Sequence, residues 1–188
     1  SHEAAYNQLL LESGYVPVHS FVEMGFDPDV PLPEKKMPEG FALKPAGVED
    51  YRAIWEANEE AFEEEWGHRR ATDEDYIVFL GNIVGNPGFD PSLWQVAWRD
   101  EAIAGVALCE ITPRGVGEIS ELSVRQQWRN HGLGRALLIS ALHALRLFRH
   151  QWQSSLGVAQ GAWLNGDPSG CRGWRGYRRL DGAARGVV

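Results

Sequence analysis

Two glycines stand two positions apart where a pattern typical of a strand gives way to one typical of a helix. The strand pattern ends at Val124, and Gly132-Leu133-Gly134 opens the helix pattern. The first N–H groups of a helix have no partner inside it, and the helix dipole adds partial positive charge there. Such a turn can bind a diphosphate or a similar anion, because glycine lets the ligand approach the amides. Arg129 and Arg135 flank the turn and add charge-assisted contacts.

Two well-known phosphate-binding motifs do not fit this turn. A dinucleotide fold would place a third glycine or alanine at position 137, which is Leu137. It would also place an acidic residue about 20 positions further on, where residues 152–156 offer none. A P-loop requires Gly-Lys followed by Ser or Thr, which the sequence lacks. The turn therefore predicts a phosphate ligand of another kind.

The composition and charge of the chain exclude several functions. The 188 residues carry a formal net charge of -8, from 18 Lys and Arg against 26 Asp and Glu, unlike a surface for nucleic acid. No apolar run approaches the roughly 20 residues of a membrane span, and no signal peptide is recognisable. The two cysteines and six histidines lack the spacing of a metal site. We therefore expect a cytoplasmic protein that binds no nucleic acid, no membrane and no metal.

The elements that position the turn follow from hydrophobic periodicity and capping residues. We expect helices over 3–11, over 48–66, from Thr72 onward and over 132–150. Ser13-Gly14 would close the first of these, and Asp75 would complete a capping box with Thr72 at the start of the third. We expect strands over 15–24, 41–44, 93–98, 103–111, 117–124 and 155–159. The long helix places Leu133, Ala136, Leu137, Leu138, Ala141, Leu142, Leu145 and Phe148 on its apolar face. This order predicts an α/β fold with a mixed, mostly antiparallel central sheet flanked by helices.

Prolines divide the chain. Four of them stand among the eleven residues from Pro28 to Pro38, which excludes a helix or a central strand there. We expect residues 1–25 to form a helix-strand segment, residues 26–40 a linker, and residues 41–188 the main domain. Residues 161–188, rich in Gly, Arg and Trp, form an atypical tail, either a divergent end or the product of an altered reading frame.

The turn and the strand before it carry a family resemblance. Arg129-x-x-Gly132-x-Gly134, after Glu118-Ile119-Ser120-Glu121-Leu122-Ser123-Val124, resembles the acetyl-CoA motif of the GNAT family of N-acetyltransferases. The family pattern is Gln or Arg, x, x, Gly, x, Gly or Ala, at the start of the long helix after the fourth strand. The predicted elements match the order of the GNAT fold from residue 41 to about residue 159.

The resemblance implies a cofactor site. Acetyl-CoA would be the co-substrate, with its pantetheine arm paired to the backbone of Leu122, Ser123 and Val124. Its pyrophosphate would lie on the backbone amides of the turn, which belong to Arg129, Asn130, His131, Gly132, Leu133, Gly134 and Arg135.

Acetyl transfer to an amine requires a base. An alkyl amine with a pKa of about 10.4 is protonated at neutral pH, and removing that proton costs on the order of 4–5 kcal/mol. Glu118 and Glu121 are the candidates, and regular strand alternation places them on opposite faces, so that only one faces the substrate. By resemblance, Glu118 has the place of the general-base glutamate of histone-acetylating members. It also has the place of a substrate-contacting glutamate in mycothiol synthase.

We therefore favour Glu118 as base or amine anchor and keep Glu121 as the second choice. In a third interpretation both are solvated strand charges and another group is the base. The run Glu59, Glu60, Glu63, Glu64 and Glu65 is either the solvated face of a helix or a negative rim that attracts a cationic amine.

The sequence departs from the family after the fifth strand. The family pattern there is Asn-x-x-x-Ala-x-x-Leu-Tyr-x-x-x-Gly-Phe, with the tyrosine protonating the departing thiolate. Counted back from Gly176-Tyr177, Arg172 takes the tyrosine's place, so the general acid is unassigned. Residues 9–15 resemble the closing helix and strand of a GNAT domain, with Leu10 at the tyrosine's place.

We hypothesise that residues 1–25 are the remnant of a first GNAT copy and dock in their own or a neighbouring chain, the latter giving a homodimer. The sequence as a whole predicts transfer of acetyl from acetyl-CoA to a primary amine of a small molecule, by direct attack in a ternary complex. The alternatives are a catalytically weak acyl-CoA-binding module and a mycothiol-synthase-like acetyltransferase.

Overall fold

The computed structural model describes residues 2–18, 24–86, 88–112 and 115–155. Two compact units divide the chain, one ending at Asp27 and the other beginning at Pro28. The atypical tail, the place of Arg172 and all but the first residue of the strand predicted over 155–159 lie outside the described residues. Ser155 itself is the last residue of a helix, so a strand beginning there is wrong.

The first unit contains the predicted N-terminal helix. Helix α1 spans His2–Glu12, and Gly14 closes it at a φ of 88°. The N–H of Tyr15 donates to the carbonyl of Leu10 (3.0 Å), as in a left-handed helix cap. Residues 15–18 and Met24 belong to no strand, so the strand predicted over 15–24 is wrong at these positions. An alternation of apolar and polar residues does not by itself provide a neighbouring strand to pair with, and Pro17 has no N–H to donate to one.

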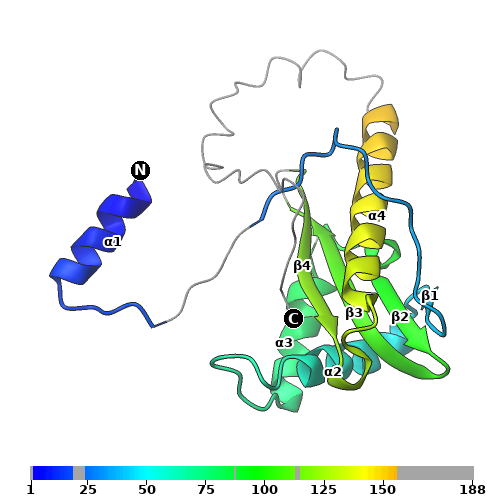
Figure 1. The fold of residues 1–188 in the computed structure, drawn as a ribbon, viewed down its shortest axis with the longest axis horizontal. Coiled ribbons are helices and arrows are strands. Elements are labelled where there is room, and N and C mark those ends of the chain that lie inside the picture. Colours follow the sequence, from blue (N-terminus) through cyan, green and yellow to red (C-terminus); the bar gives the residue numbers. More distant parts are fainter. Residues whose placement is uncertain (1, 19–23, 87, 113–114, 156–188) are drawn as a thin grey trace. The chain divides into compact units, whose positions relative to one another are not determined.

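The second unit has the predicted order of elements through the long helix (Figure 1). They are β1 (Ala42–Lys44), α2 (Tyr51–Ala61), α3 (Asp73–Ile83), β2 (Gln95–Arg99), β3 (Ala102–Ile111), β4 (Gly117–Val124) and α4 (Leu133–Ser155), with 3₁₀ turns at Val48–Asp50, Pro91–Leu93 and Gln126–Trp128. The sheet order is β1-β2-β3-β4, with every neighbouring pair antiparallel. Among the described helices, none has the length and apolar character needed to cross a membrane.

Residues close together in the sequence correctly predict the start of α3 but not the ends of α2. Thr72 caps α3, accepting from the N–H of Asp75 (3.4 Å), and its own N–H donates to the Asp75 carboxylate (2.8 Å). Helix α2 was expected over 48–66 but ends at Ala61. The acidic run from Glu63 follows it, and negative charge at the carboxyl end of a helix opposes the helix dipole.

Helices cover both faces of the sheet, and each face has its own core (Figure 1). The α4 face buries Phe41, Leu93, Ala97, Ala104, Ala107, Cys109, Leu133, Leu137 and Ala141. The other face buries Tyr51, Ile54, Ala57, Trp94, Val96, Ile103, Val106 and Leu108 beneath α2, with Phe79, Leu80 and Ile83 of α3 packed against them. Any group that β4 directs toward α2 therefore lies on the opposite side of the sheet from α4.

The proline-rich segment that leads into β1 contacts α4. Met37 packs against the core on the α4 face. The imidazole Nε2 of His143 donates to the carbonyl of Pro33 (2.8 Å), and the guanidinium of Arg146 donates to the carbonyl of Val30. The predicted boundaries at residues 25 and 40 stay predictions.

Two neighbouring leucines of α4 test the packing on this face. Leu137 is fully buried (0% exposed), whereas Leu138, expected on the same apolar face, is 38% exposed. Leu137→Ala should lower the free energy of unfolding by about 2–5 kcal/mol, because the cavity cannot collapse completely. Leu138→Ala should cost less than about 1 kcal/mol. Urea unfolding followed by circular dichroism measures both, and equal losses would contradict this packing.

Candidate functional site

The turn between β4 and α4 leaves a row of backbone amides without partners. Ala136 is the first residue of the long helix whose N–H finds a backbone acceptor, the carbonyl of Gly132 (3.1 Å). Within the described part of the chain, no hydrogen bond uses the N–H groups of residues 130–135. These are the amides that the sequence predicts for the pyrophosphate. They lie at the positive end of the 23-residue helix α4, a suitable environment for an anion.

The two glycines of the turn have different roles. Gly132 has a φ of 78°, in the left-handed region that favours glycine, and Asn130 before it has a φ of 66°. A Cβ added at Gly132 would meet nothing within 4 Å, so its backbone conformation alone requires glycine. A Cβ at Gly134 would lie 3.7 Å from Val124 Cγ2, an ordinary contact. The backbone therefore tolerates alanine at position 134, as the family pattern does.

Arg129 ties the turn to α2. Its Nε donates to the carbonyl of Val124 (3.1 Å), one terminal nitrogen to the carbonyl of Ala61 (2.6 Å), and the other pairs with Glu64 (3.0 Å). A cation that binds the last carbonyl of a helix also complements the helix dipole. The predicted contact of this side chain with pyrophosphate stays a prediction. Arg135 is exposed on the first turn of α4.

A second arginine, Arg125, supports the same region, and the sequence analysis missed it. The backbone N–H of Arg125 donates to the carbonyl of Ala104 (3.0 Å). One terminal nitrogen of its guanidinium donates to the carbonyl of Ile103 (3.1 Å), and the other pairs with Glu60 of α2 (2.5 Å). No local pattern marks this residue, because its partners lie on a distant strand and helix. The imidazole Nδ1 of His131 donates to the carbonyl of Arg129 (2.7 Å) and so fixes the loop.

The predicted pantetheine-binding residues end β4. Leu122 is 37% exposed, Ser123 is buried toward α2, and Val124 packs toward α4. In the described part of the chain β4 pairs only with β3. A pantetheine arm that bonded to the backbone of these residues would lie along the other edge of β4.

Glu118 and Glu121 lie on one face of the sheet, so the prediction of opposite faces is wrong. Leu108 pairs with Glu121 and Cys109 with Ile119, which leaves Ser120 of β4 unpaired as a β-bulge. The extra residue offsets the strand alternation. Directly paired residues share a face, so Glu121 follows Leu108, and Glu118 follows Glu110. Both carboxylates therefore face the α2 side.

The two carboxylates differ in their environment. Glu118 is exposed, whereas Glu121 is partly buried. Burial raises the pKa of the Glu121 carboxyl, a hydrogen bond from the Asn58 side chain lowers it, and the charges of Glu59 and Glu65 raise it, with an upward net shift. Sequence reasoning missed Asn58, although a polar residue in the apolar stripe of a predicted helix was a signal. The assignment of the base to either glutamate stays a prediction at this point.

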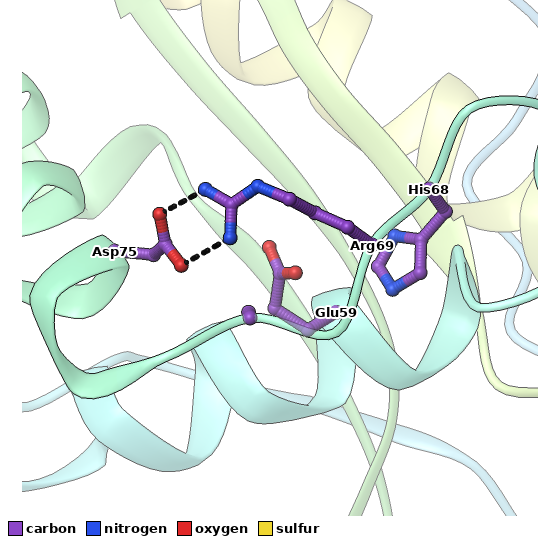
Figure 2. A pocket seen from close by; sticks show the side chains of 5 residues that line it. Glu59, His68, Arg69 and Asp75 are labelled. Carbon is purple, nitrogen blue, oxygen red and sulfur yellow. Dashed lines mark hydrogen bonds and ion pairs between the residues drawn. The ribbon is translucent and has the colours of Figure 1, made fainter.

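A shallow pocket of about 240 Å³ lies between α2 and α3, lined by Glu59, His68, Arg69, Ala71 and Asp75 (Figure 2). Arg69 points at Asp75 and binds both of its oxygens (2.5 and 2.8 Å), which holds the pKa of that carboxyl well below its usual range. Glu59 forms no ion pair within the described residues, but its charge also acts on Arg69. With two carboxylates against one guanidinium in its lining, the pocket has an excess of acidic side chains.

The acidic run from Glu59 to Glu65 is only partly free to form a negative rim. Glu60 pairs with Arg125 and Glu64 with Arg129.

Within the described residues, no group of three His, Cys, Asp or Glu side chains is placed to hold a metal ion. The expectation of no metal stays a prediction.

Comparison with known proteins places these features in context. Residues 51–171 match the Acetyltransferase (GNAT) family. Mycothiol acetyltransferase from Thermomonospora curvata is 30% identical over 119 residues, which cover 63% of this chain and 39% of that protein. The crystal structure of a GCN5-related N-acetyltransferase from Sphaerobacter thermophilus matches with a TM-score of 0.59 and 28% identity, over 78% of this chain and 44% of that chain. The chain therefore spans less than half the length of each of these two relatives.

The raised pKa of Glu121 predicts an effect on stability. The native carboxyl binds its proton more tightly than the unfolded one does, so the stability gained from protonation is complete at low pH and is lost as the pH rises through the native pKa. Glu121→Gln, which mimics the neutral acid, should raise Tm at pH 7, and the difference should shrink toward pH 4. Differential scanning calorimetry measures it, with the exposed Glu118→Gln as control. A lower Tm for Glu121→Gln at pH 7 would contradict this account.

Proposed function

The chain belongs to the Acetyltransferase (GNAT) family, and from this premise we propose that it transfers acetyl from acetyl-CoA to the primary amine of a small molecule. The transfer is by direct attack in a ternary complex. The row of unbonded amides at the start of α4, beside the end of β4, is the observation that carries the proposal. A diphosphate satisfies these amides and the helix dipole together.

Different segments of the chain bind different parts of acetyl-CoA in this proposal. The amides of residues 130–135 fit the pyrophosphate, and the backbone of residues 122–124 fits an amide-bearing arm as a further strand would. Arg125 and Arg129 keep the turn against α2 through Glu60, Glu64 and the carbonyl of Ala61. When bound, acetyl-CoA supplies the thioester that is cleaved.

The acceptor must lose a proton before it reacts. An alkylammonium with a pKa of about 10.4 lies roughly three units above neutral pH, so a carboxylate near its nitrogen accelerates the reaction by accepting the proton. The C–N bond then forms as the C–S bond breaks, and the thiolate leaves and takes up a proton from a group not yet assigned. Glu118 and Glu121 face the same side, and burial raises the pKa of the Glu121 carboxyl, as expected of such a base.

The pocket between α2 and α3 supports a cationic acceptor of small size. Its volume is about 240 Å³, and its lining contains two carboxylates, Glu59 and Asp75, against one guanidinium, Arg69. Glu59 also acts electrostatically on Glu121, which links the pocket to the candidate base. A pocket with an excess of acidic side chains attracts an ammonium group and repels anionic acceptors.

Two other functions remain candidates. The 30% identity to mycothiol acetyltransferase favours a related activity, and the chain covers 39% of that protein. An acyl-CoA-binding module with weak catalysis is favoured by Arg172 at the place of the family tyrosine. The cytoplasmic location, the homodimer through residues 1–25 and the absence of nucleic-acid and membrane partners stay predictions.

Thiol release from acetyl-CoA over a panel of amines tests the activity. We expect turnover with at least one cationic amine and a loss of about 10²-fold or more in kcat for Glu121→Gln, because the base is removed. Glu118→Gln, on the same face but exposed, is the matched variant, and Arg129→Ala should weaken acetyl-CoA binding. Tight CoA binding without turnover on any amine would favour the binding module. No CoA binding at all would overturn the proposal.

The two glycines of the turn test the pyrophosphate site. Gly132→Ala must hold alanine at positive φ, at a cost of about 1–2 kcal/mol, or reshape the loop. We expect it to weaken acetyl-CoA binding about tenfold by calorimetry, whereas Gly134→Ala should change Kd by only a few-fold. Unchanged binding in the Gly132 variant would mean that the pyrophosphate lies elsewhere.

A further inference from the structure

Arg99, the last residue of β2, lies near the predicted pyrophosphate site. Its guanidinium carbon is 5.3 Å from the centre of the Phe41 ring, in a cation–π contact. The same ring lies 6.4 Å from the imidazole of His131, measured between the ring centroids. His131 belongs to the turn whose unbonded backbone amides fit the pyrophosphate. A single aromatic ring therefore connects this turn to an exposed arginine of another element.

The guanidinium of Arg99 is held on more than one side. Gly40 has a φ of 82°, in the left-handed region that favours glycine. A Cβ built at Gly40 would lie 3.8 Å from the guanidinium carbon, so Arg99 also lies beside this backbone. Phe41 is only 8% exposed and belongs to the core on the α4 face. The buried ring and the Gly40 backbone restrict the positions of the guanidinium, which lowers the entropy that it loses on binding a ligand.

The charge of Arg99 is not used inside the molecule. The chain has 26 Asp and Glu against 18 Lys and Arg, so most cations can find an acidic partner. Arg125 and Arg129, which hold the turn, are each paired with a glutamate. Within the described residues, no hydrogen bond or ion pair involves the guanidinium of Arg99, although Asp100 and Glu101 follow it directly. Its donors are therefore available to a ligand.

A fixed, exposed and unpaired guanidinium suits a phosphate group. Its planar fork matches two phosphate oxygens and forms charge-assisted hydrogen bonds with them. Acetyl-CoA carries one phosphate besides its pyrophosphate, which is the 3′-phosphate on the ribose of its adenosine end. The ribose joins the two groups, so they must bind to neighbouring parts of the protein. Arg99 is separated from the turn by the Phe41 ring alone.

The remaining arginine at the turn is less well placed for this role. Arg135 is exposed on the first turn of α4, and no contact within the described residues fixes its guanidinium. A free arginine side chain loses more rotamer freedom on binding than one that is already held. Arg99 is therefore the better receptor for a second phosphate.

We propose that Arg99, held by Phe41 and Gly40, binds the 3′-phosphate of acetyl-CoA and so anchors the adenosine end of the co-substrate. This inference rests on the proposed use of acetyl-CoA. The amides of residues 130–135 bind the pyrophosphate, and Arg99 supplies a cation beside them. The 3′-phosphate is remote from the thioester, so the contact contributes to binding of the co-substrate and not to the chemical step.

The test compares two ligands that differ only in this phosphate. Calorimetry on the full chain measures Kd for CoA and for dephospho-CoA, which lacks the 3′-phosphate. We expect the wild type to bind CoA about five- to tenfold more tightly, and Arg99→Gln to bind both ligands about equally. Arg99→Lys keeps the charge but loses the fork, so it should keep part of the preference. Added salt should reduce the preference, because the contact is exposed.

The ratio of the two Kd values separates this contact from general damage, because a distorted site weakens the binding of both ligands alike. Arg70→Gln removes an exposed arginine from the segment before α3 and should leave the ratio unchanged. A wild type that binds both ligands equally, or an Arg99→Gln variant that keeps the full preference, would overturn this inference and leave the proposed function standing. A chain that binds neither ligand would overturn the proposed function, and the inference with it.

Discussion

The attachment of α2 to the end of β4 by Arg125 and Arg129 is the interaction on which the candidate site depends. Arg129 binds the carbonyl that ends β4, the carbonyl that ends α2, and Glu64 after it. Arg125 binds Ile103 of β3 and Glu60 of α2. The amides at the start of α4 follow this junction, and Asn58 stands just before it on α2. These two arginines thus hold the predicted cofactor site and the candidate base in fixed positions relative to each other.

The charge balance of this region combines stability and function. The acidic run from Glu59 to Glu65 lies at the carboxyl end of α2 and opposes its dipole, and the charges of Glu59 and Glu65 add to the burial that raises the pKa of Glu121. Pairing with Arg125 and Arg129 neutralises two members of the run, while Glu59 and Glu65 keep their effect on Glu121. Under the proposed function, the raised pKa of Glu121 suits this carboxylate to accept a proton from the amine.

Membership of the GNAT family accounts for the parts of this chain that the family pattern covers. The sheet order, the long helix after β4 and the glycine turn belong to that common framework. The chain also spans less than half of each relative compared with it, so the activity of those whole proteins does not transfer directly.

The sequence by itself determined what short-range rules control. Thr72 and Asp75 cap α3 and Gly14 ends α1, because each needs only its nearest neighbours. Only the tertiary structure decided which face each glutamate of β4 occupies, because the bulge at Ser120 arises from pairing with β3. It also decided that Leu138 is exposed and that Asn58 meets Ser123, since both depend on elements distant in the chain. A pattern of period two or 3.6 carries no information about which distant surface covers it.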